Sequence, residues 1–358
     1  MLYHLLYPLR AQYPPLNVMR YITFRTLMAA LTAMVVSLVL GPRLIRWLKS
    51  LQIRQSIRTD GPAAHAGKAG TPTMGGVLIL FSLVLATLLL ADLREWTVWL
   101  ALGVTLAHGC IGFLDDFAKV KKRNSVGLPG RARLGAELVI GAGAATVVYL
   151  WSEQHGQLAM PFFKGLRPDL GWWYVPLGAF IIAGAANAVN LTDGLDGLAI
   201  GPVMIAGGTF AVFSYTAGNV KIAEYLQIPY VAGAGELTIF CGALAAAGLG
   251  FLWFNAYPAQ MFMGDVGSLS LGAALGITAL ITRQEIVLAM VGGVFVMEAL
   301  SVIGQVASFK LRRKRIFRMA PIHHHFELLG WPEPQIIVRF WIIAVVCALA
   351  ALSTLKLR

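Results

Sequence analysis

The sequence predicts an all-α integral membrane protein with about ten transmembrane helices. Hydrophobic residues make up 58% of the 358-residue chain and charged residues only 13%, too few to cover the surface of a water-soluble protein of this size. The apolar residues are gathered into long windows, each about as long as a helix that crosses a bilayer. We therefore expect a single polytopic membrane domain over residues 1–358.

Ten windows of roughly 17 to 25 residues are apolar enough to span a membrane. The first begins near Ile22; it is too long for a signal peptide and lacks a small-residue cleavage site. The three cysteines lie in apolar windows at uneven spacings, which argues against a disulfide framework or a cysteine metal site. The expected spans are 22–45, 73–91, 97–114, 134–151, 174–191, 198–216, 237–254, 266–282, 285–305 and 336–356.

Lysine and arginine are concentrated in alternate connecting segments of this arrangement. Ten spans place both termini on one side of the membrane, and the loops on the other side hold 18 of the 29 basic residues. Because positively charged loops remain in the cytoplasm, we expect both termini to be periplasmic, although contact with anionic lipids would also account for the charge. The loops expected in the cytoplasm are 43–72, 115–133, 192–197, 255–265 and 306–335.

Clusters of polar residues fall on the same cytoplasmic face. FLDDFAK ends the third span, NAVNLTDGLDG joins the fifth and sixth, NAYPAQMFMGDVGS joins the seventh and eighth, and PIHHHFE follows the ninth. Buried polar groups cost free energy unless a partner or ligand satisfies them. The sequence therefore predicts an active site on the cytoplasmic face, assembled from segments that are distant along the chain.

In FLDDFAKVKKR, two adjacent aspartates stand at the expected end of the third span. On a helix, Asp115 and Asp116 point about 100° apart, so they can face one ligand only if the helix frays there; otherwise they serve different ligands. Two carboxylates at a helix C-terminus also oppose the helix dipole. This cost favours a bound cation or a catalytic task, the alternative being a solvated helix end.

In NAVNLTDGLDG, a polar residue recurs every three positions at Asn187, Asn190, Asp193 and Asp196. Gly194 loosens the backbone after Asp193, which favours a broken helix whose polar groups line a cavity. Such groups suit a nucleotide base or sugar, or a phosphate held through a metal. A hydrogen-bonded interface between helices is the alternative.

In NAYPAQMFMGDVGS, Asn255 and Asp265 flank a proline-containing loop with Phe262 between them. Gly264 lets the backbone approach a ligand closely. Asp265 opens the eighth expected span, where a carboxylate could simply cap the helix. That capping role does not exclude metal binding.

PIHHHFE places His323, His324 and His325 side by side. Three adjacent side chains cannot all reach one ion, which argues against a zinc site of the usual spacing. Contacts with a phosphate or a sugar are the favoured role, and a structural role in the loop is the alternative.

Lys68 and Thr73, in HAGKAGTPTMGG, precede the second expected span from a glycine-rich loop. A lysine and backbone N–H groups at a helix start form a candidate anion site. An ordinary turn leading into the helix accounts for the segment equally well.

Together these residues indicate phosphoryl transfer to a lipid. Carboxylates and amides without cysteine ligands favour a hard cation such as Mg²⁺, and the basic loops supply counter-charge for phosphates. A site at the cytoplasmic edge of the bilayer can meet a soluble substrate and a lipid substrate together.

FLDDFAK, NAVNLTDGLDGLA, WFNAYPAQMFMGD and PIHHHFE, in this order across ten expected spans, resemble the phospho-N-acetylmuramoyl-pentapeptide transferases. These belong to the polyprenyl-phosphate N-acetylhexosamine-1-phosphate transferase superfamily. The resemblance implies a Mg²⁺-dependent enzyme of the bacterial inner membrane that joins phospho-MurNAc-pentapeptide from UDP-MurNAc-pentapeptide to undecaprenyl phosphate, giving lipid I and UMP for peptidoglycan synthesis. It implies contact with membrane lipids but not with nucleic acid, and it leaves a homodimer open.

The resemblance also implies roles for individual residues. Asp265 would be the principal Mg²⁺ ligand, while Asp115 and Asp116 would serve the lipid phosphate and the metal, and His324 would take part in catalysis. The implied nucleotide pocket comprises Asn187, Asn190, Asp193, Gly194, Leu195, Asp196, Asn255 and Phe262. Positions near the phosphates, the sugar or the lipid are Lys68, Thr73, Lys119, Lys121, Arg131, Gln305, His323 and His325.

Two details of this mechanism concern the need for a general base and the residue at position 131. A strong general base is not required, because a phosphate monoester has its second pKa near 6 and is largely dianionic at neutral pH. Arg131 stands where some relatives carry lysine, which keeps the charge but changes the hydrogen-bonding geometry. Direct attack and an aspartyl-phosphate intermediate both remain open.

Two other classes of membrane protein share some of these features. A transporter would carry intramembrane aspartates and broken helices, but it predicts internal repeats and acidic residues near the bilayer midplane, and the sequence shows neither. An intramembrane aspartyl protease would use a carboxylate pair, for which MGDV around Asp265 is suggestive, but it leaves the asparagines and histidines unexplained. Release of UMP from a UDP-sugar distinguishes the transferase from both.

Overall fold

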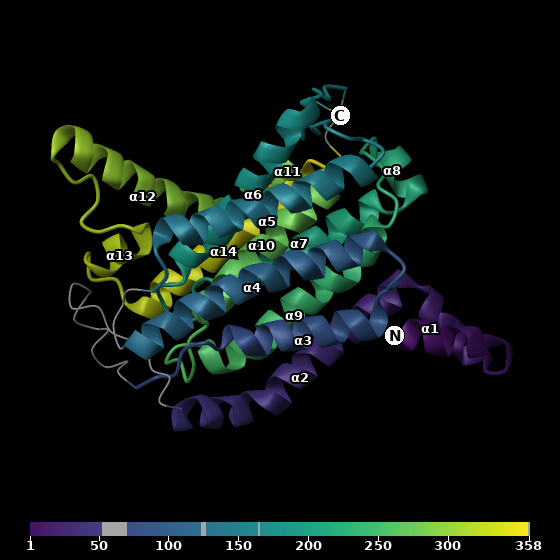
Figure 1. Ribbon diagram of the computed structural model, residues 1–358, viewed down its shortest axis with the longest axis horizontal. Helices are drawn as coiled ribbons and strands as arrows, with labels where there is room; N and C mark the ends of the chain where they lie inside the picture. Colours follow the sequence, from purple (N-terminus) through teal and green to yellow (C-terminus); the bar gives the residue numbers. More distant parts are fainter. Residues whose placement is uncertain (52–69, 123–126, 164, 357–358) are drawn as a thin grey trace.

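The computed structural model describes residues 1–51, 70–122, 127–163 and 165–356, and these residues form helices and no named strand. The long helices lie lengthwise against one another (Figure 1). The α-helices are α1 (Leu2–Leu6), α2 (Ile22–Ser50), α3 (Gly76–Leu90), α4 (Trp96–Lys122), α5 (Gly130–Trp151), α6 (Tyr174–Thr192), α7 (Ile200–Ala217), α8 (Val220–Leu226), α9 (Leu237–Asn255), α10 (Gly264–Ile281), α11 (Glu285–Val291), α12 (Gly293–Arg312), α13 (Ile322–Glu327) and α14 (Glu333–Ser353). Four short 3-10 turns are η1 (Tyr7–Ala11), η2 (Pro14–Arg20), η4 (Gly171–Trp173) and η5 (Ala234–Glu236).

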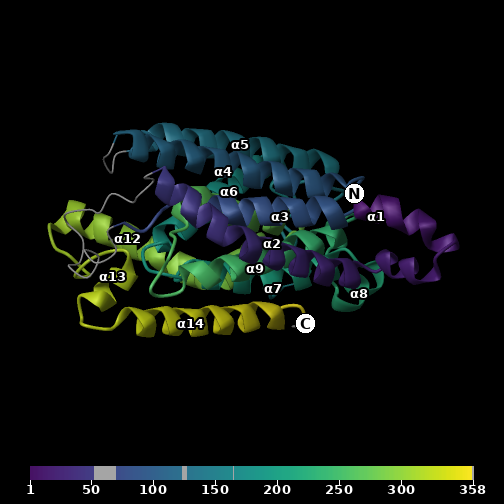
Figure 2. The same ribbon diagram turned by 90° about the horizontal axis from the view of Figure 1, so that it is seen from below.

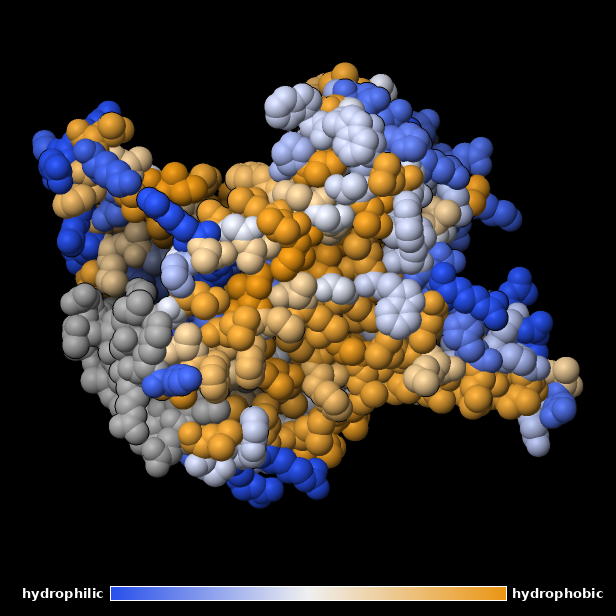
Figure 3. Space-filling view, in the orientation of Figure 1, coloured by the Kyte–Doolittle hydropathy of each residue, from blue (hydrophilic) through white to orange (hydrophobic). Residues whose placement is uncertain are grey.

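The helices have the length and the surface of a multi-pass membrane protein. Among the described residues, nine helices are long and apolar enough to cross a membrane, and α3 is a shorter apolar helix. Figure 3 shows a broad hydrophobic band over the middle of the molecule, with hydrophilic residues gathered toward its ends. This confirms the predicted all-α, polytopic membrane fold.

One expected span is interrupted in the structure, and another becomes helical later than expected. The window 285–305 is divided into α11 and α12, because adjacent glycines at 292 and 293 interrupt it and Gly292 has non-helical dihedral angles. The window 73–91 is helical only from Gly76, because the residues before it pair with another loop: the N–H of Phe262 donates to Pro72 O, and that of Gly75 to Phe262 O, both at 2.8 Å.

Helix α4 continues to Lys122, which corrects the expectation that Asp115 and Asp116 end a helix. The two aspartates lie more than one turn before the end of the helix, so their carboxylates are not at its dipole terminus. Lys119 is one turn beyond Asp115 on the same helical face, and the pair is an i,i+4 ion pair.

Helix α10 is the centre of the bundle, since every residue from Val266 to Ile281 is buried. Small residues bring its backbone against its neighbours, as is common between membrane helices. A Cβ atom on Gly112 of α4 would lie 2.2 Å from Asp265 O, and one on Gly272 of α10 would lie 2.4 Å from Ala185 O of α6. These contacts fix Asp265, at the start of α10, beside the part of α4 that carries the two aspartates.

Both ends of the chain lie toward the same end of the bundle, while α13 lies at the opposite end (Figures 1 and 2). In Figure 2, α14 runs along one edge of the molecule and α5 along the other. This arrangement agrees with an even number of crossings. The assignment of the two ends to the periplasm and the cytoplasm stays a prediction from the positions of lysine and arginine.

We expect Gly112→Ala to destabilise the protein, because the new methyl group would overlap the backbone of α10 at Asp265. Overpacking of this kind costs about 1–3 kcal/mol of unfolding free energy. A Cβ atom added at Gly103 of the same helix would meet no neighbouring atom within 4 Å, so Gly103→Ala is the matched control and should be neutral or slightly stabilising. Thermal unfolding in detergent measures both; equal stability of the two variants would contradict the close packing of α4 and α10.

Candidate active site

Three carboxylates from two helices converge at one end of the bundle. Asp115 and Asp116 of α4 and Asp265 of α10 each offer an oxygen, and these oxygens lie within 4.8 Å of one another. The two α4 aspartates thus meet one site without fraying of the helix, contrary to the expectation from their 100° separation, because Asp265 approaches from the neighbouring helix. Oxygen donors in this number suit a hard divalent cation.

Two basic side chains contact this cluster. The Lys119 ammonium lies 2.6 Å from both Asp115 Oδ2 and Asp265 Oδ2, and 3.8 Å from Asp116 Oδ1. Arg133 Nη1 lies 3.5 Å from Asp265 Oδ2 and 4.0 Å from Asp115 Oδ2. Both basic side chains are partly exposed, so an anion arriving from solvent can reach them.

Neighbouring groups hold the carboxylates in place. Asn190 Nδ2 donates to Asp265 Oδ1 at 2.7 Å and to Ser268 Oγ at 2.8 Å. Asp115 Oδ1 accepts from the N–H of Leu128 at 2.6 Å, and Asp116 Oδ2 accepts from the N–H of Val266 at 3.3 Å. Protein groups from α6, α10 and the residues before α5 therefore orient the three carboxylates.

The glycine that begins α10, directly before Asp265, also lies against the site. Gly264 has a φ of +73°, a conformation that favours glycine. A Cβ atom there would lie 2.5 Å from Asp116 Oδ2 and 3.0 Å from Thr73 Oγ1. The buried hydroxyl of Thr73 is thus next to the acidic cluster, which places the segment before α3 at the site.

Asp193 lies in the turn after α6, near the same negative charges. Burial of its carboxyl, followed by the charges of Asp265, Asp116 and Asp196, raises the pKa of Asp193 to about 8. The pKa is raised because ionising a further acid among carboxylates is unfavourable. A cation at the cluster would reverse this effect, so the surroundings of Asp193 also favour cation binding.

The turn after α6 is tied to the loop before α10. Asp196 Oδ2 accepts from the N–H of Ala259 at 3.0 Å, and Asn255 Oδ1 accepts from the N–H of Gly197 at 3.0 Å. The N–H of Asp196 donates to Glu333 Oε1 at 2.9 Å, which adds α14 to the same frame. Leu195 packs in a buried hydrophobic cluster. These hydrogen bonds join the turn after α6, the loop before α10 and the start of α14 to one another.

The three histidines lie on the short helix α13 and have three different environments. His323 is fully buried, and its Nδ1 is hydrogen-bonded to Glu298 Oε1 at 3.0 Å. His324 Nδ1 is hydrogen-bonded to Glu327 Oε2 at 2.6 Å, and His325 Nδ1 accepts from the N–H of Arg318 at 3.2 Å. The Nδ1 atoms of the three histidines therefore have three separate protein partners.

The remaining predicted residues are spread more widely. Gln305 binds the loop after α12, because its Nε2 donates to Phe317 O and its Oε1 accepts from the N–H groups of Ile316 and Phe317. Phe262 is half-buried, whereas Lys121 is exposed. Lys68 lies outside the described residues.

Sequence reasoning singled out Arg131, but Arg133 is the arginine that reaches the carboxylates. Arg131 is exposed. Two further acids were missed: Glu137, which faces Arg133 and Asn187, and Glu298, which faces His323. Each stands inside an apolar window, and an acid in such a window is a signal that could have revealed it.

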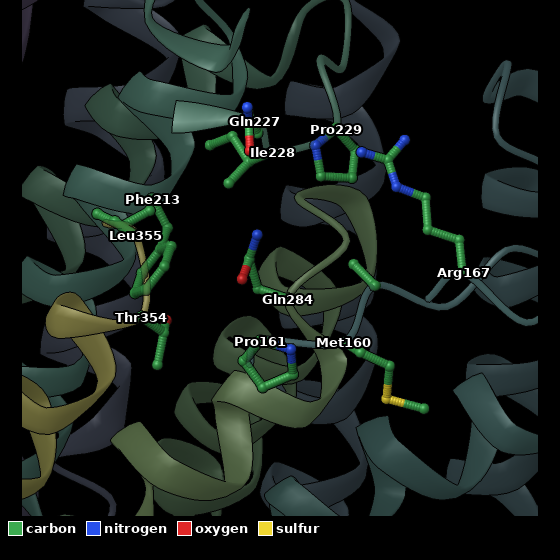
Figure 4. A pocket seen from close by; sticks show the side chains of 11 residues that line it. Met160, Pro161, Arg167, Phe213, Gln227, Ile228, Pro229, Gln284, Thr354 and Leu355 are labelled. Atoms are coloured by element: carbon green, nitrogen blue, oxygen red, sulfur yellow. The ribbon is translucent and has the colours of Figure 1, made fainter. Parts of the chain in front are cut away.

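The pocket shown in Figure 4 contains none of the predicted site residues. Phe213, Gln284 and Leu355 are among the residues that line it. Gln284 follows the C-terminal end of α10, whereas Asp265 is at its N-terminal end, so about 27 Å of helix separates the pocket from the carboxylates.

Comparison with known proteins identifies similar sequences along the whole chain. Residues 98–283 match the glycosyl transferase family 4 model, and residues 68–80 match signature 1 of the phospho-N-acetylmuramoyl-pentapeptide-transferases. The phospho-N-acetylmuramoyl-pentapeptide-transferase of Syntrophus aciditrophicus is 61% identical over 359 residues and that of Pelobacter propionicus 58% identical over 358 residues. Both alignments cover 100% of each chain.

We expect Gly194→Ala to loosen the turn after α6. A Cβ atom at Gly194 would lie 2.2 Å from Nε2 of the buried His323, so the turn or the imidazole must move. Amide hydrogen exchange across residues 193–199 should become about tenfold faster or more. Gly184→Ala in α6, where an added Cβ atom would meet no neighbouring atom within 4 Å, is the control; unchanged exchange in both variants would show that His323 does not support the turn.

Proposed function

Because the chain belongs to the phospho-N-acetylmuramoyl-pentapeptide-transferase family, we propose that the carboxylate cluster of α4 and α10 is where it makes lipid I. The substrates are UDP-MurNAc-pentapeptide and a polyprenyl phosphate, for which we propose undecaprenyl phosphate, and the second product is UMP. The proposed location is the bacterial inner membrane, with the cluster on the cytoplasmic side. The observation that carries the assignment is the convergence of three carboxylates within 4.8 Å.

The reaction is a phosphoryl transfer. An oxygen of the polyprenyl phosphate forms a bond to the sugar-bearing phosphorus of the donor, and the bond from this phosphorus to the bridging oxygen breaks, so that UMP leaves. At neutral pH the acceptor phosphate is largely dianionic, so no side chain needs to remove a proton. The main task of the protein is to position and screen two anions.

The acidic cluster fits Mg²⁺ by the chemistry of its donors. Asp265, Asp115 and Asp116 would hold the ion, and they supply the carboxylate oxygens that Mg²⁺ prefers. When bound, Mg²⁺ neutralises charge on the pyrophosphate. The contacts of the Lys119 ammonium with all three carboxylates support the view that this position attracts a cation.

The side chains around the cluster have distinct proposed tasks. Lys119 and Arg133 are the basic groups that phosphate oxygens would meet, since both contact the carboxylates and both are partly exposed. Asn190 orients Asp265 by its hydrogen bond. We place the nucleotide beside the turn after α6 and the loop before α10, because hydrogen bonds of Asp196 and Asn255 hold these two segments together.

Asp265→Asn tests this assignment. The variant keeps the size of the side chain but removes one carboxylate, and we expect release of UMP to fall by about a hundredfold or more, the usual effect of losing a key electrostatic group. The assay is UMP formation from UDP-MurNAc-pentapeptide with undecaprenyl phosphate and Mg²⁺ in detergent.

The matched control is Glu153→Gln, an acid-to-amide change at an exposed position of the loop after α5, which should keep full activity. Thermal unfolding checks that both variants are folded. Full activity of Asp265→Asn at ordinary Mg²⁺ concentration would remove the metal assignment. A wild-type protein that transports a solute or cleaves a peptide without forming UMP would overturn the proposed function.

A further inference from the structure

We propose that Glu137 is a positioning residue that, together with Asn187, holds the Arg133 guanidinium in the orientation in which it meets a substrate phosphate. The inference rests on the proposed function, because it assumes that phosphates bind beside the acidic cluster. Glu137 lies in α5, a helix that contributes no carboxylate to the cluster. It would therefore act on the reaction through Arg133 and not by direct contact with the metal.

Each nitrogen of the Arg133 side chain has its own partner. Nε lies 3.5 Å from Glu137 Oε1, and Nη2 donates to Asn187 Oδ1 at 3.1 Å. Nη1 is left to face the cluster, 3.5 Å from Asp265 Oδ2. Asn187 Nδ2 in turn donates to Glu137 Oε2 and to Ala183 O. Arg133, Glu137 and Asn187 thus form a closed triangle with one nitrogen pointing outward.

The burial of Glu137 shows that this triangle is not an incidental surface contact. Glu137 is 0% exposed, and a buried carboxylate within a membrane helix is unfavourable unless a partner compensates its charge. Arg133 supplies that charge and Asn187 supplies a hydrogen bond. Glu137 and Asn187 each hold one side of the planar guanidinium, and this orientation depends on the fixed fork of an arginine, which the point charge of a lysine lacks.

Without Glu137, the guanidinium would be attracted further toward Asp265 and Asp115, which already lie 3.5 and 4.0 Å from Nη1. It would then compete with a cation for the carboxylates and would no longer present a free edge to an anion. Glu137 therefore keeps Arg133 at the border of the cluster. Arg133 is partly exposed there, so a phosphate group can approach it.

Both substrates carry phosphate, and the experiment distinguishes the polyprenyl monophosphate from the pyrophosphate of the nucleotide sugar. KM and kcat of Glu137→Gln are measured by UMP release, with each substrate varied in turn at saturating concentration of the other. We expect KM for one of the two to rise about tenfold, the effect of weakening one charged hydrogen bond, with a smaller change in kcat. The substrate whose KM rises is the one that meets Arg133.

A double-mutant comparison separates positioning from general structural support. In an Arg133→Lys background, Glu137→Gln should have little further effect on the same KM, because the planar group that Glu137 holds is already absent. If Glu137 only supported the structure, Glu137→Gln would instead change KM by the same factor in the wild-type and Arg133→Lys backgrounds. Glu137→Asp, which keeps the buried charge but shortens its reach, provides the same test if Glu137→Gln does not fold.

An unchanged KM for both substrates in folded Glu137→Gln or Glu137→Asp would overturn the proposal. An equal rise in KM in the wild-type and Arg133→Lys backgrounds would also overturn it. The wild-type protein and the exposed Glu153→Gln variant are assayed alongside. Absence of UMP with the wild type would count against the proposed function itself. Normal turnover by the wild type, together with unchanged KM values in the Glu137 variants, would refute only the role of Glu137.

Discussion

Mutual repulsion of three carboxylates is the constraint around which this end of the molecule is built. These oxygens lie within 4.8 Å of one another, and two negative charges at that distance repel by about 3 kcal/mol at an effective dielectric constant of about 20. The close contact of α4 and α10 forces Asp115, Asp116 and Asp265 together in spite of this repulsion. Lys119 and Arg133 compensate part of it, and a divalent cation would compensate the rest. The same charges that make the site costly make it selective for cations and the phosphates they accompany.

The surrounding polar residues differ in how directly they serve this site. Asn190 contacts Asp265 itself, whereas Asn187 and Glu137 act one step away, through Arg133. Asp196 and Asn255 join the turn after α6 to the loop before α10, and Glu298 binds His323. An unpartnered polar group is unfavourable in a low-dielectric interior, so most of these groups bind one another, and among the described residues Glu137 Oε1, Glu298 Oε2 and His323 Nε2 are the buried atoms of this network that lack a hydrogen bond. This explains why so many polar residues gather at one end of an otherwise apolar bundle.

The sequence was sufficient to predict the helical membrane fold, because hydropathy locates the membrane spans. It was also sufficient to predict the convergence of Asp115, Asp116 and Asp265, because counting the spans between these residues places them on the same side of the membrane. It was not sufficient to distinguish Arg131 from Arg133. Residues two apart on a helix point about 200° apart, so only the rotation of α5 about its axis decides which arginine faces the cluster. The break at Gly292 was missed for a similar reason, since an apolar window reports hydropathy and not backbone continuity. Orientation and local breaks depend on packing against neighbours.

The far end of α10 shows why Asp265 stays in register with its partners. After α10 ends, the buried Arg283 guanidinium lies over the ring of Tyr174 at 4.7 Å, and the Tyr174 hydroxyl donates to Glu285 Oε1 at 2.6 Å. Tyr174 begins α6, and Asn190 near the other end of α6 binds Asp265. The two helices are therefore joined at both ends and touch in the middle at Gly272. Sliding α10 by one turn, about 5.4 Å, would break all three contacts at once, so the position of Asp265 is set by the length of the whole helix and not only by the charges around it.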